Sequence, residues 1–411
     1  MEENISFLQE MFTNASETCI KHALRQTNSL DDAVSMLVDG DGLGTVSKVL
    51  AAIQEKTVDA GSEYVLKISR DNVWADGMKF YKTALGDISL LKKKFVVKFD
   101  NESGIDLGAL KNEFFTLMFE KAKKELFESD VSKVWQCVPK RSGGNTHIFK
   151  IFGIIIAHSL LHRGPYFNNL APWAVEILCD GEVSGQISVE SIPLTLATGM
   201  TINLIKNLQN CNNDDDIVNL FNSTEAPGYE QIIGLSEWDQ NVDITIENKS
   251  ILIDMLVYEE VITRRSGKIK AIKEGLSMLG ITEYLHLPIV KELFIGKPGK
   301  VTANRLLSII KWPVVTESKK NQAIAFFNSF IKNSDELVLI KLLKFITGFN
   351  DLSPLVDNGN CIEVDFVMEN FPKSSACLRI IHLPCIHSNE IDFDKNMELA
   401  LEIESEGYGE F

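Results

Sequence analysis

Several features that would mark a nucleic-acid-binding, membrane-spanning or exported chain are missing from this sequence. Lys and Arg number 41 against 57 Asp and Glu, which gives a net charge of −16 and leaves no basic stripe to neutralise phosphates. The longest apolar stretches, such as residues 148–161, include Lys150 and His158 and are shorter than a bilayer span. The first residues show no basic segment followed by an apolar run, so no signal peptide is expected. We therefore predict a cytoplasmic or nuclear protein with no nucleic-acid partner and no membrane span.

The spacings typical of disulfide frameworks and metal sites are missing as well. The seven cysteines are an odd number and form no CxxC pair, which indicates reduced thiols in a chain of this length. His158 and His162 are four residues apart, as in a two-ligand metal site, but no HExxH glutamate lies between them and no third ligand is near. We interpret both as core or helix-end residues and predict neither a metal nor a cofactor.

Apolar residues, in contrast, are plentiful enough for several folded domains. They make up 45% of the 411 residues, which suffices for substantial cores in two to four domains. Their periodicity predicts an amphipathic helix at 70–81 and a strand at 93–99. A turn and a long helix follow within 100–127, and residues 146–164 predict a helix buried on most sides. The expected fold class is α+β.

The first forty residues predict a small helical unit of their own. Three short helices are expected, at 6–11, 16–26 and 30–38, with Ser29 as the N-cap of the third. The glycine-rich segment that follows, 39–45, has no strand before it and lacks GxxxxGK, so it is not a phosphate loop. Residues 41–60 are predicted to be a linker to the main body.

One stretch near the end, Phe371–Pro384, combines a single cysteine with a change from polar to apolar residues. Cys377 follows a short polar turn at 373–376 and precedes an apolar run, 378–383, with the composition of a buried strand. Alternation would place Cys377, Arg379 and Ile381 on one face and His382 on the other. Free cysteine is often buried, so a core role competes with an exposed, reactive thiol.

This stretch and two others resemble, in the same order, the C-terminal lobe of HECT-type ubiquitin ligases. The other two are LLKFITG at 342–348 and EGYG at 406–409. Two earlier segments resemble the N-terminal lobe of the same family, at 97–115 and 245–296. The resemblance implies a large, mostly helical N-lobe at 61–313 and a small α/β C-lobe at 323–411, joined by a hinge at 314–322. It also implies that about 200–290 of the N-lobe contains the part that docks a ubiquitin-conjugating enzyme.

Within that family the cysteine accepts ubiquitin as a thioester, so the resemblance implies Cys377 as the nucleophile. The partners implied are ubiquitin, a conjugating enzyme and protein substrates, whose lysines receive the ubiquitin. Arg379 is a candidate to favour the thiolate, although a surface arginine is the simpler interpretation. Tyr408 replaces a family phenylalanine thought to position the lobe, and Cys385 stands where the family has proline, which disfavours it as nucleophile.

The residues around the cysteine also depart from the family. Ser375 and Ala376 replace His and Thr, and His382 replaces an Asp thought to assist lysine attack. His382 could take over as general base, because histidine titrates near neutral pH. The main alternative is therefore an impaired relative that only binds ubiquitin or a conjugating enzyme. A third is an unrelated helical scaffold with a chance cysteine.

Residues 1–40 resemble the CUE/UBA class of ubiquitin-binding helical modules. Met11 and Phe12 fall at its Met-Phe loop, although Thr13 replaces the proline of CUE domains, and Leu37 and Val38 fall at the apolar end of its third helix. An apolar patch of this kind binds a small hydrophobic surface weakly. The alternative is a helical cap packed on the rest of the chain.

Overall fold

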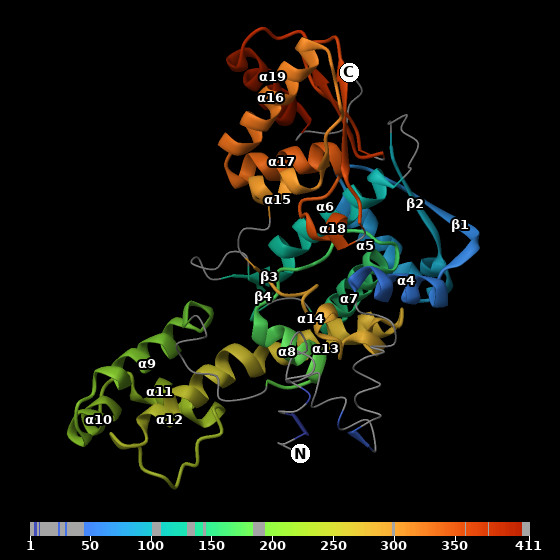
Figure 1. The fold of residues 1–411 in the computed structure, drawn as a ribbon. Coiled ribbons are helices and arrows are strands. Elements are labelled where there is room, and N and C mark those ends of the chain that lie inside the picture. Colours follow the sequence, from blue (N-terminus) through green and yellow to red (C-terminus); the bar gives the residue numbers. More distant parts are fainter. Residues whose placement is uncertain are drawn as a thin grey trace.

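The computed structural model has a helix-rich α+β fold (Figure 1). It describes residues 45–100, 108–129, 136–142, 145–183, 194–297, 301–357, 359–376 and 378–404, with a few isolated residues before 45. The predicted three-helix unit, with Met11, Phe12, Leu37 and Val38, lies outside the described residues. Buried apolar side chains form two clusters, one from Val49 to Phe294 and one from Val301 to Leu401.

The first cluster begins inside the segment that we predicted to be a linker, and for residues 46–57 that prediction is wrong. These residues form helix α4 (Val46–Thr57), whose N-terminus is capped by the Thr45 side chain. Val49, Leu50 and Ile53 are spaced by one helical turn and are buried in the core. The apolar face of this helix packs into the core, so the linker that the glycine-rich segment 39–45 suggested does not extend through these residues.

Strands β1 (Asp59–Ile68) and β2 (Lys93–Phe99) follow as a parallel pair. The β2 range confirms the predicted strand, because Phe95, Val97 and Phe99 are all buried on one face. Helix α5 (Val73–Ala84) and the 3₁₀ turn η2 (Ile88–Lys92) connect the two strands, and α6 (Ala109–Leu126) packs next to β2. The predicted helices at 70–81 and within 100–127 are therefore present, with shifted ends.

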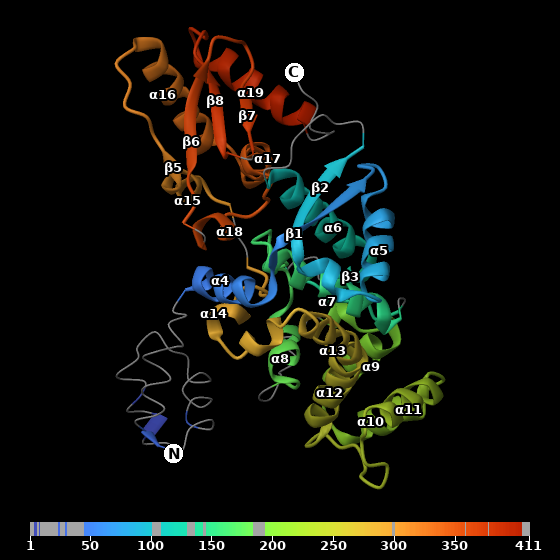
Figure 2. The same ribbon diagram turned by 90° about the vertical axis from the view of Figure 1, so that its right-hand side faces the viewer.

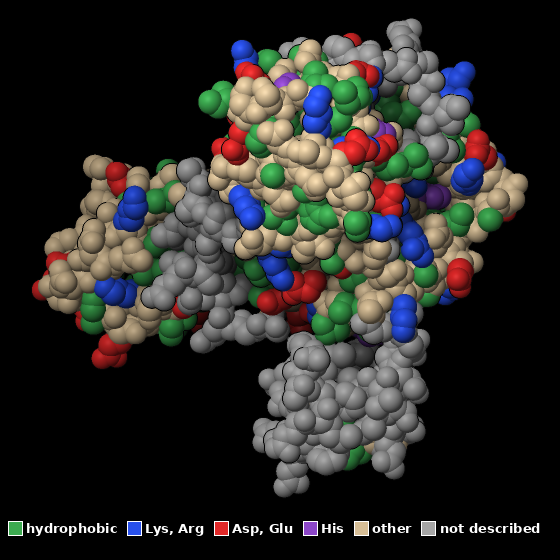
Figure 3. Space-filling view, turned by 45° about the horizontal axis from the view of Figure 1, so that its top comes forward, with side chains coloured by type: hydrophobic (Ala, Val, Ile, Leu, Met, Phe, Trp, Pro, Cys, Tyr) green, Lys and Arg blue, Asp and Glu red, His purple; other side chains and the backbone are tan. Residues whose placement is uncertain are grey.

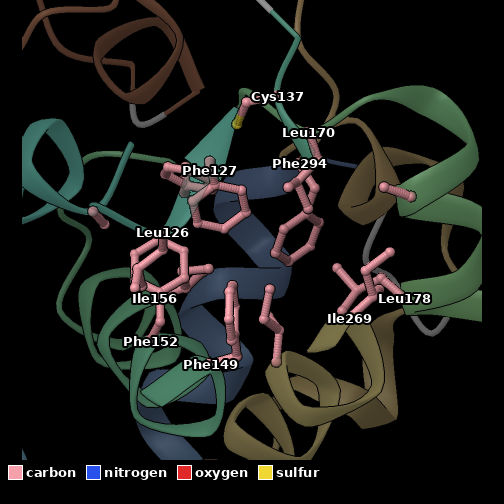
Figure 4. Close-up of a cluster of buried hydrophobic side chains, with 14 of the residues drawn as sticks. Leu126, Phe127, Cys137, Phe149, Phe152, Ile156, Leu170, Leu178, Ile269 and Phe294 are labelled. Atoms are coloured by element: carbon pink, nitrogen blue, oxygen red, sulfur yellow. The ribbon is translucent and has the colours of Figure 1, made fainter. Parts of the chain in front are cut away.

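The centre of this cluster is helix α7 (Thr146–Leu161), which confirms the predicted buried helix. Its main neighbour is α13 (Arg264–Ser277), and aromatic side chains from several elements meet beside it (Figure 4). Phe152 makes edge contacts with Phe127 and Phe167, at ring-centroid distances of 5.3 and 4.8 Å. The remaining elements around it are β3 (Phe127–Glu128), β4 (Val138–Pro139), α8 (Pro172–Asp180), η6 (Ile281–Tyr284) and α14 (Pro288–Lys291).

Helices between residues 199 and 257 form a unit that extends away from this centre (Figures 1 and 2). They are α9 (Gly199–Asn210), α10 (Asp214–Phe221), α11 (Ala226–Leu235) and α12 (Lys249–Val257), preceded by the 3₁₀ turn η4 (Leu194–Leu196). A π-helical turn, η5 (Tyr258–Thr263), joins α12 to α13. Arg265, which is fully buried, connects this unit to the first core. Its guanidinium group donates hydrogen bonds to the carbonyl oxygens of Pro139 (3.0 Å) and Leu196 (2.8 Å).

The second cluster contains a four-stranded sheet in the order β5-β6-β8-β7. The strands are β5 (Ile310–Lys311), β6 (Ile362–Val367), β7 (Lys373–Ser375) and β8 (Ile380–Pro384). β6 pairs in parallel with β5 and β8, whereas β7 and β8 are antiparallel. The helices here are α15 (Ala303–Ser308), α16 (Ser318–Asn333), α17 (Glu336–Thr347), α18 (Ser353–Asp357) and α19 (Glu390–Glu404), and α16 and α17 contact β8 (Figure 2).

The two clusters divide earlier than the predicted boundary at 313. Val301, Leu306 and Ile310 belong to the second cluster, because β5 pairs with β6 and carries the preceding helix with it. The predicted hinge at 314–322 is only partly irregular, since α16 begins at Ser318. Residues 312–317 lie between β5 and α16 without regular structure.

On the face shown in Figure 3, basic side chains of the described residues are interspersed with acidic ones. Among the described residues, no helix is both long and apolar enough to cross a membrane.

The two buried histidines make stability depend on pH. His158 and His162 line the first core, with ring centroids 4.8 Å apart. Burial, reinforced by nearby Lys111, lowers the pKa of His162 to about 4. Below pH 6.5 the unfolded chain binds a proton that the folded chain excludes, so stability falls as pH is lowered.

We expect His162 alone to remove about 2 kcal/mol of unfolding free energy between pH 7 and pH 5. Urea unfolding at the two pH values, compared with His162→Gln, measures this term because glutamine does not titrate but keeps a donor for the Leu91 carbonyl oxygen. The variant should lose less stability than the wild type on acidification. Equal losses would contradict the prediction.

Candidate functional site

The stretch around position 377 forms a β-hairpin rather than the turn and strand that we predicted. Three residues of the predicted polar turn, 373–375, are strand β7, which pairs with β8. Strand β8 begins at Ile380, two residues later than predicted. Lys and Ser seldom favour strands, so the composition of 373–375 predicted a turn. Pairing with β8 at the edge of the sheet overrides this weak local preference.

Arg379 therefore does not share a strand face with its neighbours, and the predicted alternation is wrong at this residue. Its φ of 57° is left-handed and ends the turn before β8 starts. Its Nε is buried and has no hydrogen-bond partner among the described residues. Hydrogen bonds from Leu378 N to Ser375 O (2.9 Å) and from Arg379 N to Ala376 O (3.2 Å) close this turn.

Cys377 itself, like Tyr408, lies outside the described residues. Its sequence neighbours on either side are described: Ala376 is partly buried and Leu378 is exposed. Position 377 thus falls between the two strands of a hairpin that is anchored in the second core through Ile381 and Leu383, both fully buried.

His382 lies on the outer face of the sheet, opposite Ile381 and Leu383, as the alternation predicted. Its side chain is 27% exposed and lies between groups from both neighbouring strands. The Nδ1 atom is 3.3 Å from Asp365 Oδ2 on β6, and Nε2 is 3.4 Å from Ser375 Oγ on β7. A histidine between a carboxylate and a hydroxyl can accept and pass on a proton while its ring is held in place.

Asp365 was missed by the sequence analysis. It stands 17 residues before His382 in a strand that pairs with β8 only through the tertiary fold. Alternation within β6 could have placed Asp365 on the solvent face, since Ile362 and Val364 are buried. Its partner, however, depends on the register of a parallel pair, which neither strand encodes alone.

Two further cysteines in the C-terminal part of the chain bear on the choice of nucleophile. Cys385 is buried, and its Sγ contacts the Val367 carbonyl oxygen and Met368 Sδ, each at 3.3 Å. A thiol in such a place is poorly accessible to a protein substrate. Cys361 is exposed, just before β6.

The histidine pair that resembled a metal site by spacing is a core feature. His158 Nδ1 is 2.9 Å from the Tyr81 hydroxyl oxygen, and His162 Nε2 is 3.3 Å from the Leu91 carbonyl oxygen. Within the described ranges, no group of three or more His, Cys, Asp or Glu side chains could hold a metal ion.

Two hydrogen bonds bridge the core clusters close to α17. Thr116 Oγ1 donates to Gly348 O (3.2 Å), and Asn168 Nδ2 donates to Asp351 Oδ2 (2.8 Å). Gly348 ends α17 with a left-handed φ of 76°, and it closes the LLKFITG segment. The segment that resembles the family motif thus lies at the contact between the clusters.

Comparisons with known proteins agree with these features. A model of the HECT-domain (ubiquitin-transferase) family matches residues 112–410, which include the later part of the first core, the second core and the hairpin. The chain is 24% identical over 371 residues to E3 ubiquitin-protein ligase RSP5 of Chaetomium thermophilum, covering 84% of this chain and 43% of that protein. It is 24% identical over 373 residues to E3 ubiquitin-protein ligase pub1 of Schizosaccharomyces pombe, covering 84% and 46%. It is 23% identical over 375 residues to the probable E3 ubiquitin-protein ligase hulA of Aspergillus flavus, covering 84% and 43%.

The chain therefore spans less than half the length of these relatives. The family match nevertheless covers well over half of the chain itself. This protein belongs to the HECT-domain family.

Proposed function

We propose that this protein is an E3 ubiquitin ligase that accepts ubiquitin from a conjugating enzyme as a thioester on Cys377 and transfers it to a substrate lysine. The observation that carries the proposal is the family match over residues 112–410, which includes position 377. The relatives' names as E3 ubiquitin-protein ligases support it. The thiol of Cys385 is buried against the Val367 carbonyl oxygen, which favours Cys377 over Cys385 as the nucleophile.

The conjugating enzyme is proposed to dock on the extended helical unit α9–α12. This unit contacts the rest of the chain mainly at its base, where Arg265 is buried, and it leaves several large apolar side chains exposed. Those side chains are Met200, Val218, Leu235, Val242, Ile251 and Tyr258. Exposed apolar residues on a protruding unit are typical of a protein-docking surface.

The two core clusters are proposed to be the N-lobe and C-lobe of a bilobal domain. The second cluster holds the hairpin and contacts the first through hydrogen bonds such as Asn168–Asp351. The groups that make these hydrogen bonds can bond to water instead once the lobes separate, so the net cost of breaking each bond is modest. Transfer between two thiols requires such movement, because each thiol belongs to a different protein.

The alternative function is an impaired relative that binds ubiquitin or a conjugating enzyme without transferring ubiquitin. The altered residues Ser375, Ala376 and His382 around the cysteine favour it. The interpretation of residues 1–40 as a ubiquitin-binding module remains a prediction and is compatible with either function.

The two functions are separated by one assay. The full chain is incubated with charged conjugating enzymes, and the products are run on a non-reducing gel. A ubiquitin adduct that disappears on treatment with a thiol supports the ligase. Stable binding of ubiquitin or the conjugating enzyme without any adduct, across a panel of conjugating enzymes, would favour the alternative.

His382 is proposed to act as the general base for the lysine step. His382→Ala should slow discharge of the thioester to free lysine about 100-fold, because general base catalysis contributes effects of this order. Thioester formation should be unchanged, because its nucleophile is a thiolate, which has no proton to give up in the attack. His387→Ala is the control, because His387 lies beyond β8 and bonds to the Asn370 carbonyl oxygen. Unchanged discharge in His382→Ala would remove His382 from the mechanism.

A further inference from the structure

The outer face of the C-terminal sheet holds a carboxylate against the ring of His382. In the parallel pairing of β6 and β8, Asp365 stands directly opposite His382. The two side chains share the solvent face, because Val364 and Ile381 beside them point into the core. The separation of 3.3 Å between Asp365 Oδ2 and His382 Nδ1 then follows from the strand register.

The backbone fixes which oxygen of Asp365 faces the ring. Asp365 Oδ1 accepts a hydrogen bond from the backbone N–H of Phe366 at 2.8 Å. That bond sets the rotation of the carboxylate and leaves Oδ2 toward Nδ1. Because the Asp365 side chain is 64% exposed, its charge is screened, and orientation of the ring is its main effect.

The other ring nitrogen of His382, Nε2, lies near the hydroxyl group of a serine among the described residues. Ser375 Oγ is 3.4 Å from Nε2, and a hydroxyl can donate to an unprotonated nitrogen. Ser375 belongs to the same hairpin as position 377, two residues before it. A substrate amine that displaces this hydroxyl would meet Nε2 as a proton acceptor.

The other charged groups near His382 are a glutamate with its own partner and basic side chains. Lys373 stands opposite it on β7 and binds Glu369 at 2.7 Å. Glu363, two residues before Asp365 on β6, binds Lys311 at 3.0 Å. Lys320 of α16 binds Glu317 and lies over the Phe366 ring, and Arg379 ends the turn before β8. Asp365 is thus the acidic residue placed to bind the ring.

We propose that Asp365 is a positioning residue for lysine transfer, whose carboxylate binds the Nδ1–H of His382 and keeps Nε2 as the proton acceptor. The inference rests on the proposed function. It adds a role for Asp365 and specifies that the neutral His382 ring carries its proton on Nδ1. The lysine nitrogen attacks the thioester carbonyl carbon, the C–N bond forms, and the C–S bond breaks with its electron pair leaving on sulfur. His382 Nε2 takes the proton lost by the nitrogen and then returns it to the thiolate or to solvent.

The kinetic test compares variants of two acidic residues on the same face of β6. Asp365→Asn should slow discharge to free lysine about tenfold, because an amide no longer selects one tautomer. Asp365→Glu should restore part of the rate. Glu363→Gln should discharge like the wild type, because Glu363 is paired with Lys311. Thioester formation is measured on the same samples and should be equal in all of them.

A second measurement is made on the wild-type chain itself, and a variant serves only to assign the signal. In the wild-type chain, nitrogen NMR of the histidines at pH 8 should show His382, assigned with His382→Ala, protonated on Nδ1. An Nε2-protonated ring would overturn the inference, as would wild-type discharge by Asp365→Asn or an equal loss in Glu363→Gln. Absence of any thioester in the wild type would instead contradict the proposed function itself, so the two failures are distinguishable.

Discussion

Replacement of Cys377 by alanine is expected to abolish the thiol-sensitive ubiquitin adduct completely. The adduct is a bond to one sulfur atom, so removal of that sulfur leaves nothing to acylate, and the effect is all-or-none. Cys377→Ser should give a ubiquitin adduct that survives thiol treatment, because an oxygen ester is not cleaved by thiol exchange. Both products are read on the same pair of reducing and non-reducing gels.

Two other cysteines in the C-terminal part of the chain provide matched controls. Cys361→Ala removes an exposed thiol, and Cys385→Ala removes a buried thiol eight residues after Cys377. Both variants should form the adduct as the wild type does. If Cys361→Ala lost the adduct and Cys377→Ala kept it, the nucleophile would be Cys361. That result would contradict the proposed site.

Local periodicity explains which parts of the fold were predictable. Strand β2 was predicted residue for residue, because its alternating side chains match an alternating burial. Helix α7 was predicted because nearly all of its side chains are apolar and it lies in the middle of the core. In both cases the signal lies within the segment itself, so no knowledge of the packing partner was needed.

The errors occur where a distant segment decides the structure. Residues 373–375 are a strand only because β8 pairs with them, and residues 310–311 join the four-stranded sheet only because β6 pairs with them. Prediction of the candidate site is limited in the same way, because it also depends on contacts between distant segments. Cys377 and His382 are candidates that motif resemblance and local sequence suggest, whereas the contact between Asp365 and His382 depends on the register of a parallel strand pair.

The second large effect is expected in the first core, where α7 and α13 touch at two glycines. A Cβ built on Gly275 would lie 2.1 Å from the Lys150 carbonyl oxygen and 2.7 Å from the Ile154 nitrogen. One on Gly153 would lie 2.1 Å from the Ile272 carbonyl oxygen. These neighbours are backbone atoms of packed helices, so they cannot rotate away as a side chain end would.

Gly275→Ala should therefore lower the free energy of unfolding by about 3 kcal/mol, although alanine favours a helix more than glycine does by about 1 kcal/mol. Gly267→Ala in the same helix is the control, because a Cβ there meets nothing within 4 Å. That variant should be neutral or more stable by up to about 1 kcal/mol. Urea unfolding of both variants measures the two effects. Similar stabilities would mean that the helices separate easily at this crossing, and the close packing of α7 on α13 would then contribute little to the stability of the fold.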